Sequence, residues 1–340
     1  MTSAFIAGCS GPELTPDERA FFRDAAPWGF ILFKRNVETP AQVVALTSAL
    51  REAVGRAEAP VLIDQEGGRV QRLRPPHWRQ MPPARVYGDL YMFDPVAARA
   101  AAFAGARLTA EELRNAGITV NCTPVLDVPE AGAHDIIGDR AFSFDPEIVS
   151  DLGRAVVEGT LAGGVLPVIK HVPGHGRARA DSHLALPEIH ASPEELIAVD
   201  FRPFMALRHA PLAMTAHVLL PAFDEERPAS VSPVIMSEVI RELIGLTGLV
   251  MSDDIGMEAL GGPMAERAAA VIAAGCDVAL HCSGKLDEMR EVARVVPPLD
   301  GMSAERFASA IAELGEPQAF DADQALSLVS EAAGRSGSVA

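Results

Sequence analysis

The segment 170–183, KHVPGHGRARADSH, places three histidines, one aspartate and one lysine within fourteen residues. Two kinds of chemistry could use such a set. A metal site would take His171, His175, Asp181 and His183 as ligands, since imidazole and carboxylate groups bind zinc. The proline and glycine between the first two histidines prevent the regular helix that usually presents such ligands four residues apart. Because loops can also supply ligands, the metal site stays an alternative.

An acid/base pair needs only Asp181 and His183. Their one-residue spacing on a loop lets the carboxylate accept a ring N–H and leaves the other ring nitrogen for a substrate. The carboxylate also raises the pKa of the imidazole and fixes its tautomer. We therefore expect these two residues to form an acid/base pair, on a loop whose glycines allow it to move into place.

The segment 252–254, SDD, adds two adjacent carboxylates. Neighbouring residues of a strand point to opposite faces. One of Asp253 and Asp254 can therefore face a site while the other supports a loop, and the spacing alone does not decide between them.

The elements that must position these groups are predicted from apolar runs and helix starts. Continuous β-branched runs, typical of strands covered on both faces, occupy residues 5–9, 29–33, 61–64, 118–128, 165–171, 212–218, 248–254 and 277–282. Between them a capping residue precedes a proline at Thr15, Thr39, Asp94, Asp145, Ser192 and Ser232. Eight strands alternating with helices predict an α/β protein, a single (β/α)8 TIM-type barrel. An open doubly wound sheet is the second choice, because no Gly-x-Gly-x-x-Gly turn is present.

In such a barrel the functional groups lie at the carboxyl ends of the strands. The polar residues that end the predicted strands are Asp64, Asp127, Lys170, His171, His217, Asp253, Asp254 and His281. So many at one mouth predict a binding site there. His217 and His281 each lie on an apolar strand, where a single histidine is more often structural than catalytic.

Composition restricts the class of partner. The formal net charge of −17 disfavours nucleic acid and anionic lipid. The four cysteines lack metal-ligand spacing and indicate free thiols in a reducing compartment. No run approaches the ~20 apolar residues of a membrane span, and residues 6–9, IAGC, lack the apolar stretch of a signal peptide. We expect a cytoplasmic monomer that binds a small substrate without a cofactor or metal.

No linker or repeat divides the chain. We predict one barrel domain over 1–333 and a disordered tail over 334–340. The longest interruption between strands, at 67–89, is rich in Pro, Arg and Gly and is expected to form a loop over one end of the barrel.

Five motifs together resemble one known family. IDQEGGRVQR, GDRAF, KHVPGHG…DSH, MTAHV and MSDDIGM occur in the order and approximate spacing of the bacterial β-N-acetylglucosaminidases of glycoside hydrolase family three. The resemblance extends from about residue 29 to 282, and the family is a single (β/α)8 barrel. Val172 replaces the usual Phe of one motif and Ala141 the common Ser of another. The segment from Pro75 to Arg85 does not match closely.

The resemblance implies a role for each matching residue. Asp253 matches the catalytic nucleophile, His183 the acid/base and Asp181 its partner. The residues that match the binders of the sugar hydroxyls are Asp64, Arg72, Arg140, Lys170 and His171. The implied activity is a retaining exo-β-N-acetylglucosaminidase acting on N-acetylglucosamine-containing peptidoglycan fragments in cell-wall recycling.

Other functions remain open at this point. A relative could act on another β-glycoside or transfer the sugar to phosphate instead of water. A metal-dependent amidohydrolase-like barrel belongs to a different class. A sugar-binding barrel without catalysis is disfavoured, because the nucleophile and the acid/base pair are both present.

Overall fold

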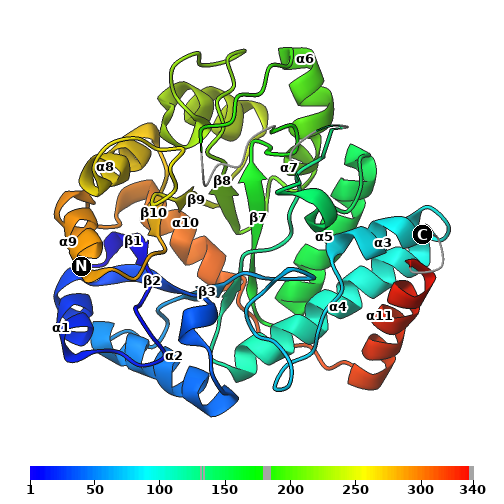
Figure 1. The fold of residues 1–340 in the computed structure, drawn as a ribbon, viewed down its shortest axis with the longest axis horizontal. Coiled ribbons are helices and arrows are strands. Elements are labelled where there is room, and N and C mark those ends of the chain that lie inside the picture. Colours follow the sequence, from blue (N-terminus) through cyan, green and yellow to red (C-terminus); the bar gives the residue numbers. More distant parts are fainter. Residues whose placement is uncertain (131, 133–134, 179–184, 337–340) are drawn as a thin grey trace.

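Eight parallel strands close into a barrel in the computed structural model, which describes residues 1–130, 132, 135–178 and 185–336 (Figure 1). The barrel strands are β1 (Ser3–Ala7), β2 (Pro27–Leu32), β3 (Val61–Ile63), β6 (Val120–Asn121), β7 (Leu166–Val172), β8 (Leu212–Thr215), β9 (Leu249–Asp254) and β10 (Val278–His281). Neighbours follow chain order, and β10 returns to pair with β1. The predicted (β/α)8 barrel is confirmed, and every strand overlaps one of the eight apolar runs.

Helices surround the strands, and all of the following except the last two begin at or near a predicted capping residue. They are α1 (Pro16–Ala25), α2 (Pro40–Val54), α4 (Pro95–Asn115), α5 (Pro146–Ala162), α6 (Pro193–Glu195) continued by η3 (Leu196–Asp200) and α7 (Arg202–Ala206), η5 (Ile235–Leu243), α8 (Met264–Ala274) and α9 (Leu286–Val295). Five predicted caps accept an N–H of the first turn through their side chains. The sixth, Ser232, accepts the N–H of Ile235 at 3.1 Å.

The apolar core has two layers. Side chains such as Leu62, Val120 and Val168 fill the barrel, and a second layer lies between the strands and the helices. Helix α10 (Gly301–Ala312) lies against the barrel interior, where Phe307 packs edge-on against Trp28 with ring centroids 5.2 Å apart. The core therefore leaves the carboxyl ends of the strands for the site.

Further elements extend the barrel. A hairpin of β4 (Gln65–Gly67) and β5 (Val70–Gln71) follows β3, and α3 (Ala84–Tyr91) follows the hairpin. Short turns are η1 (Lys34–Asn36), η2 (Gly138–Arg140) and η4 (Ala229–Val231). At the hairpin turn, Gly67 and Gly68 have φ values of 102° and 55°, a region that favours glycine.

Helix α11 (Ala322–Ser336) packs beside α4 and α3 (Figure 1). The prediction of a disordered tail from residue 334 is wrong for residues 334–336, because they belong to this helix. Residues 337–340 lie outside the described part of the chain. Among the described helices, none is both long enough and apolar enough to cross a membrane.

Candidate active site

A cavity of about 350 Å³ opens at the carboxyl ends of the barrel strands, within the size range of small-molecule sites. Its lining includes all five predicted sugar-binding residues and both carboxylates of the SDD segment: Asp64, Arg72, Arg140, Lys170, His171, Asp253 and Asp254. Arg69 and Val70 of the β4–β5 hairpin region also line it. The segment after β3 is thus part of the pocket wall, as its predicted place over one end of the barrel requires.

Asp64, Arg72 and Lys170 form a cluster of ion pairs on one side of this cavity. Asp64 follows β3, and its two carboxylate oxygens lie 2.9 Å from Lys170 Nζ and 3.0 Å from Arg72 Nη2. Burial alone would raise the pKa of Asp64, but the two cations hold it well below the usual carboxyl range. Asp64 therefore stays ionised and fixes two hydrogen-bond donors at the edge of the pocket.

Glu66 extends this cluster to Arg140. Its carboxylate is bidentate with Arg140, at 2.8 Å to Nε and 2.9 Å to Nη2, and it also lies 2.6 Å from Lys170 Nζ. Burial opposes its ionisation, yet Arg140 and Lys170 lower the pKa of Glu66 to about 2. Two carboxylates and three guanidinium or ammonium groups thus carry a net positive charge, which suits an electron-rich sugar hydroxyl or an anionic substituent.

His171 and Lys170 are adjacent, and both line the pocket. The register of β7 against β8 shifts between Lys170 and Val172, and the strict alternation of strand faces is lost there. His171 Nδ1 donates to the buried Asp127 carboxylate at 2.7 Å, and Asp127 also accepts the backbone N–H of His175 at 2.7 Å. Asp127 therefore fixes the His171 ring and leaves its Nε2 for a ligand.

Asp253 lies at the end of β9 and lines the pocket beside these groups. Its burial raises the pKa, but His171, His217 and the backbone N–H of Asp254 outweigh that effect and hold the pKa of Asp253 below its ordinary value. The N–H of Asp254 donates to Asp253 Oδ1 at 2.8 Å. An ionised carboxylate at neutral pH is the form that a nucleophile needs.

Asp254 has a different set of contacts. Its Oδ1 accepts the backbone N–H groups of Gly256 at 3.0 Å and of Cys282 at 3.1 Å. These bonds join the loop after β9 to the loop after β10. The Asp254 carboxylate therefore holds two loops together, whereas Asp254 contacts Asp253 through its backbone N–H.

The other two strand-end histidines do not line the cavity. His217 donates from Nε2 to the Asp254 carbonyl oxygen at 3.0 Å, and its Nδ1 lies 2.6 Å from Ser230 Oγ. Burial lowers the pKa of His217, as expected for a neutral supporting ring. His281 lies 3.1 Å from Glu288 of α9 and 3.1 Å from Ser283 Oγ. The expectation that all strand-end groups converge on one mouth is wrong for His281, because alternation directs it to the helix layer with Ala279.

Asp181 and His183 lie outside the described residues. Arg177, two residues before the undescribed stretch, forms two ion pairs. Its Nε lies 2.7 Å from Asp200 Oδ2, and its Nη1 lies 3.1 Å from Glu130 Oε1. Among the described residues no group of three or more His, Cys, Asp or Glu side chains has metal-binding geometry. The predicted metal site would also use Asp181 and His183 as ligands. Chelation by EDTA is the experiment that tests this alternative.

Comparison with known proteins decides the family. The model of the glycosyl hydrolase family 3 N-terminal domain matches residues 16–314. The chain belongs to glycosyl hydrolase family 3. A β-hexosaminidase of Methylococcus capsulatus is 42% identical over 277 residues, which cover 80% of each chain. The predicted class, a family 3 β-hexosaminidase, is confirmed.

Solved family 3 structures are similar over nearly the whole chain. NagZ of Neisseria gonorrhoeae in complex with N-trifluoroacetyl-D-glucosamine is 32% identical, with a TM-score of 0.87 and 98% of both chains covered. The same protein in complex with a zinc ion is 31% identical, with a TM-score of 0.84 and 98% of both chains covered.

Sequence reasoning missed Glu66 and gave Asp127 no role in this family 3 site. A signal for Glu66 was present, because Asp64 and Glu66 are two residues apart and an extended segment directs such residues to the same side. The side chain of the intervening Gln65 is turned away and donates to the Leu73 carbonyl, while the Gln65 backbone N–H donates to Asn121 Oδ1. No local signal identifies Asp127 as the partner of His171, because β6 and β7 bring them together from positions 44 residues apart.

Proposed function

We propose that this family 3 hydrolase is a retaining exo-β-N-acetylglucosaminidase that acts on peptidoglycan fragments. The observation that carries the proposal is Asp253, a buried, ionised carboxylate beside a pocket whose other charges can hold sugar hydroxyls. A retaining glycosidase needs such a carboxylate to attack the anomeric carbon and form a glycosyl–enzyme ester.

The remaining roles follow from the contacts. Arg72, Arg140 and Lys170 are held by Asp64 and Glu66 and would donate to sugar hydroxyls, while Asp64 would accept from them. His171 would offer Nε2, because Asp127 occupies Nδ1. In our proposal His183, supported by Asp181, protonates the leaving oxygen and later removes a proton from water.

The substrate class is supported by the pocket and by a relative. A cavity of about 350 Å³ suits one terminal sugar rather than a polymer. The gonococcal relative binds N-trifluoroacetyl-D-glucosamine. Peptidoglycan fragments carry a lactyl carboxylate beside the scissile bond. A histidine acid would avoid the like-charge repulsion that a carboxylate acid would meet there.

The test compares aryl β-N-acetylglucosaminide with the corresponding β-glucoside. We expect kcat/KM to favour the N-acetyl sugar by about 10²-fold or more, because a site built to bind an amide is left with unpaired groups by an analogue that lacks it. Release of N-acetylglucosamine from GlcNAc-1,6-anhydroMurNAc peptides should be comparably efficient. Preference for the glucoside, or a sugar phosphate as product when phosphate is present, would contradict the proposal.

A second experiment separates the proton relay from the metal-dependent alternative. We expect activity to survive exhaustive chelation by EDTA, because the proposed chemistry needs only carboxylates and imidazoles. Added zinc should lower activity, since it competes for the imidazoles that the relay uses, and a relative has been solved with zinc. Loss of activity with EDTA and its recovery with zinc would instead support a metal-dependent hydrolase.

A further inference from the structure

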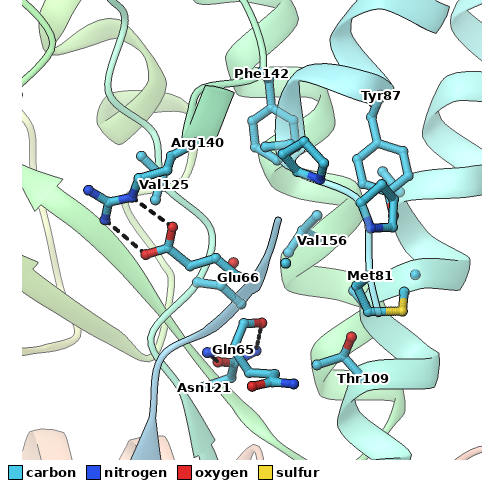
Figure 2. Close-up of a pocket in the computed structure, with 18 of the residues that line it drawn as sticks. Gln65, Glu66, Met81, Tyr87, Thr109, Asn121, Val125, Arg140, Phe142 and Val156 are labelled. Atoms are coloured by element: carbon cyan, nitrogen blue, oxygen red, sulfur yellow. Dashed lines mark hydrogen bonds and ion pairs between the residues drawn. The ribbon is translucent and has the colours of Figure 1, made fainter. Parts of the chain in front are cut away.

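Glu66 and Arg140 separate the sugar pocket from a second, inner cavity. The inner cavity has a volume of about 40 Å³, and its lining includes Thr109, Asn121 and Val156 (Figure 2). Among the described lining residues, Glu66 and Arg140 alone belong to both cavities. The bidentate pair between them is therefore part of the wall between the two spaces.

The Glu66 carboxylate is fully engaged by the two cations. Arg140 Nε lies 2.8 Å from Oε2, while Arg140 Nη2 and Lys170 Nζ lie 2.9 Å and 2.6 Å from Oε1. Both cations are held at low exposure, with 13% of the Arg140 side chain and 2% of the Lys170 side chain exposed. Asp64 also pairs with Lys170, whereas Glu66 is the only carboxylate among the described residues that forms an ion pair with Arg140.

The inner cavity is too small for a substrate. A space of about 40 Å³ holds a few waters. Beside it, the Asn121 side chain accepts the backbone N–H of Gln65 and donates to the Gln65 carbonyl oxygen (Figure 2). The space behind the carboxylate is bordered largely by apolar side chains, among them Met81, Phe142 and Val156.

We propose that Glu66 is a positioning residue that holds Arg140 and Lys170 in place for the sugar and closes the pocket toward the inner cavity. This inference rests on the proposed glycosidase function. The substitution Glu66→Ala removes the CH2–COO⁻ group beyond Cβ, and this group resembles an acetate ion. The deletion leaves two cations facing an enlarged space, and an added small carboxylate should occupy it because charge-assisted hydrogen bonds are the strong ones.

The experiment measures acetate rescue of two variants. We expect Glu66→Ala to lower kcat/KM for an aryl β-N-acetylglucosaminide by about a hundredfold, because one partner of a buried charge pair is lost. Acetate at constant ionic strength should then raise the kcat/KM of Glu66→Ala at least about tenfold. The neutral isostere acetamide should not. Glu66→Gln keeps the side-chain volume, so it should lose activity and gain nothing from acetate.

Glu112→Ala is the matched control. Glu112 Oε1 pairs with Arg79 at 2.8 Å and is 13% exposed, but it does not line the sugar pocket. It should lose some stability, keep its activity and show no response to acetate. Full activity of Glu66→Ala, equal rescue by acetamide, or loss of activity in Glu66→Ala without any acetate effect would overturn the proposal.

A binding readout separates this inference from the proposed function. Acetate should raise the Tm of Glu66→Ala well above its effect on the wild type, because a ligand that binds only the folded state stabilises it. If the wild type hydrolyses no N-acetylglucosaminide, the proposed function fails while the acetate-dependent Tm still tests the site. If the wild type is active and neither the Tm nor the activity of Glu66→Ala responds to acetate, the positioning role of Glu66 fails alone.

Discussion

Asp253→Asn is expected to abolish turnover, lowering kcat by at least about 10⁴-fold, the order found when a catalytic nucleophile is removed. The Asn amide cannot form the glycosyl–enzyme ester, and it lacks the negative charge that the ionised Asp253 carries. The variant should remain folded, because the side chains of Asn and Asp have nearly the same shape. Single-turnover kinetics with an aryl glycoside would measure the loss.

Asp254→Asn is the matched comparison. The Asn amide keeps an oxygen that can accept the N–H groups of Gly256 and Cys282, but it lacks the charge that strengthens these bonds. The substitution should therefore cost about 1 kcal/mol of unfolding free energy. Its effect on the chemical step should be much smaller than that of Asp253→Asn. Urea unfolding and initial-rate kinetics on the two variants measure both quantities. Equal loss of turnover in the two would move part of the catalytic role to Asp254.

A 5-fluoro glycoside identifies the attacking oxygen directly. Its ester forms slowly and is released more slowly, so the sugar mass should appear on the peptide containing Asp253. Fragmentation of that peptide distinguishes Asp253 from Asp254. An absence of label, combined with activity restricted to substrates with an acetamido group, would indicate that the sugar's own amide is the nucleophile.

His183→Ala should slow a natural disaccharide by about 10³-fold, within the range of general acid catalysis. An aryl glycoside with a good leaving group should be slowed by about tenfold or less, because its leaving oxygen needs little protonation. The pH profile of the variant should also lose its alkaline limb, since the wild-type limb reports deprotonation of the acid. Rates with a series of aryl leaving groups measure this difference.

His190→Ala is the control for this experiment. His190 is exposed and pairs with Glu188 at 3.0 Å, and it does not line the pocket, so its activity and pH profile should match the wild type. Equal losses on the disaccharide and the activated glycoside in His183→Ala would mean that His183 positions the substrate and does not donate the proton.

The barrel and the main charged residues of the site could be predicted from local sequence patterns. Local signals are sufficient for this, because apolar runs identify strands and a capping residue before proline identifies helix starts. Asp64, Lys170, His171 and Asp253 could be placed at one mouth because the carboxyl ends of parallel strands meet there. These patterns did not predict α11, which packs against α4 and α3, and the tail that was expected to be disordered begins within this helix.

The pairing of these charged groups could not be predicted from local patterns, because it depends on the folded path of the chain. Arg140 reaches Glu66 from a turn 74 residues away, and Asp127 reaches His171 across the β6–β7 pairing. These pairs depend on the paths of the loops after β3 and β6, which no local pattern encodes. The direction of a strand-end residue is likewise set by strand register: alternation turns His281 to Glu288, while the shift in β7 lets Lys170 and His171 both face the pocket. Side-chain type is written in the sequence, but its partner is fixed only when the chain closes the barrel.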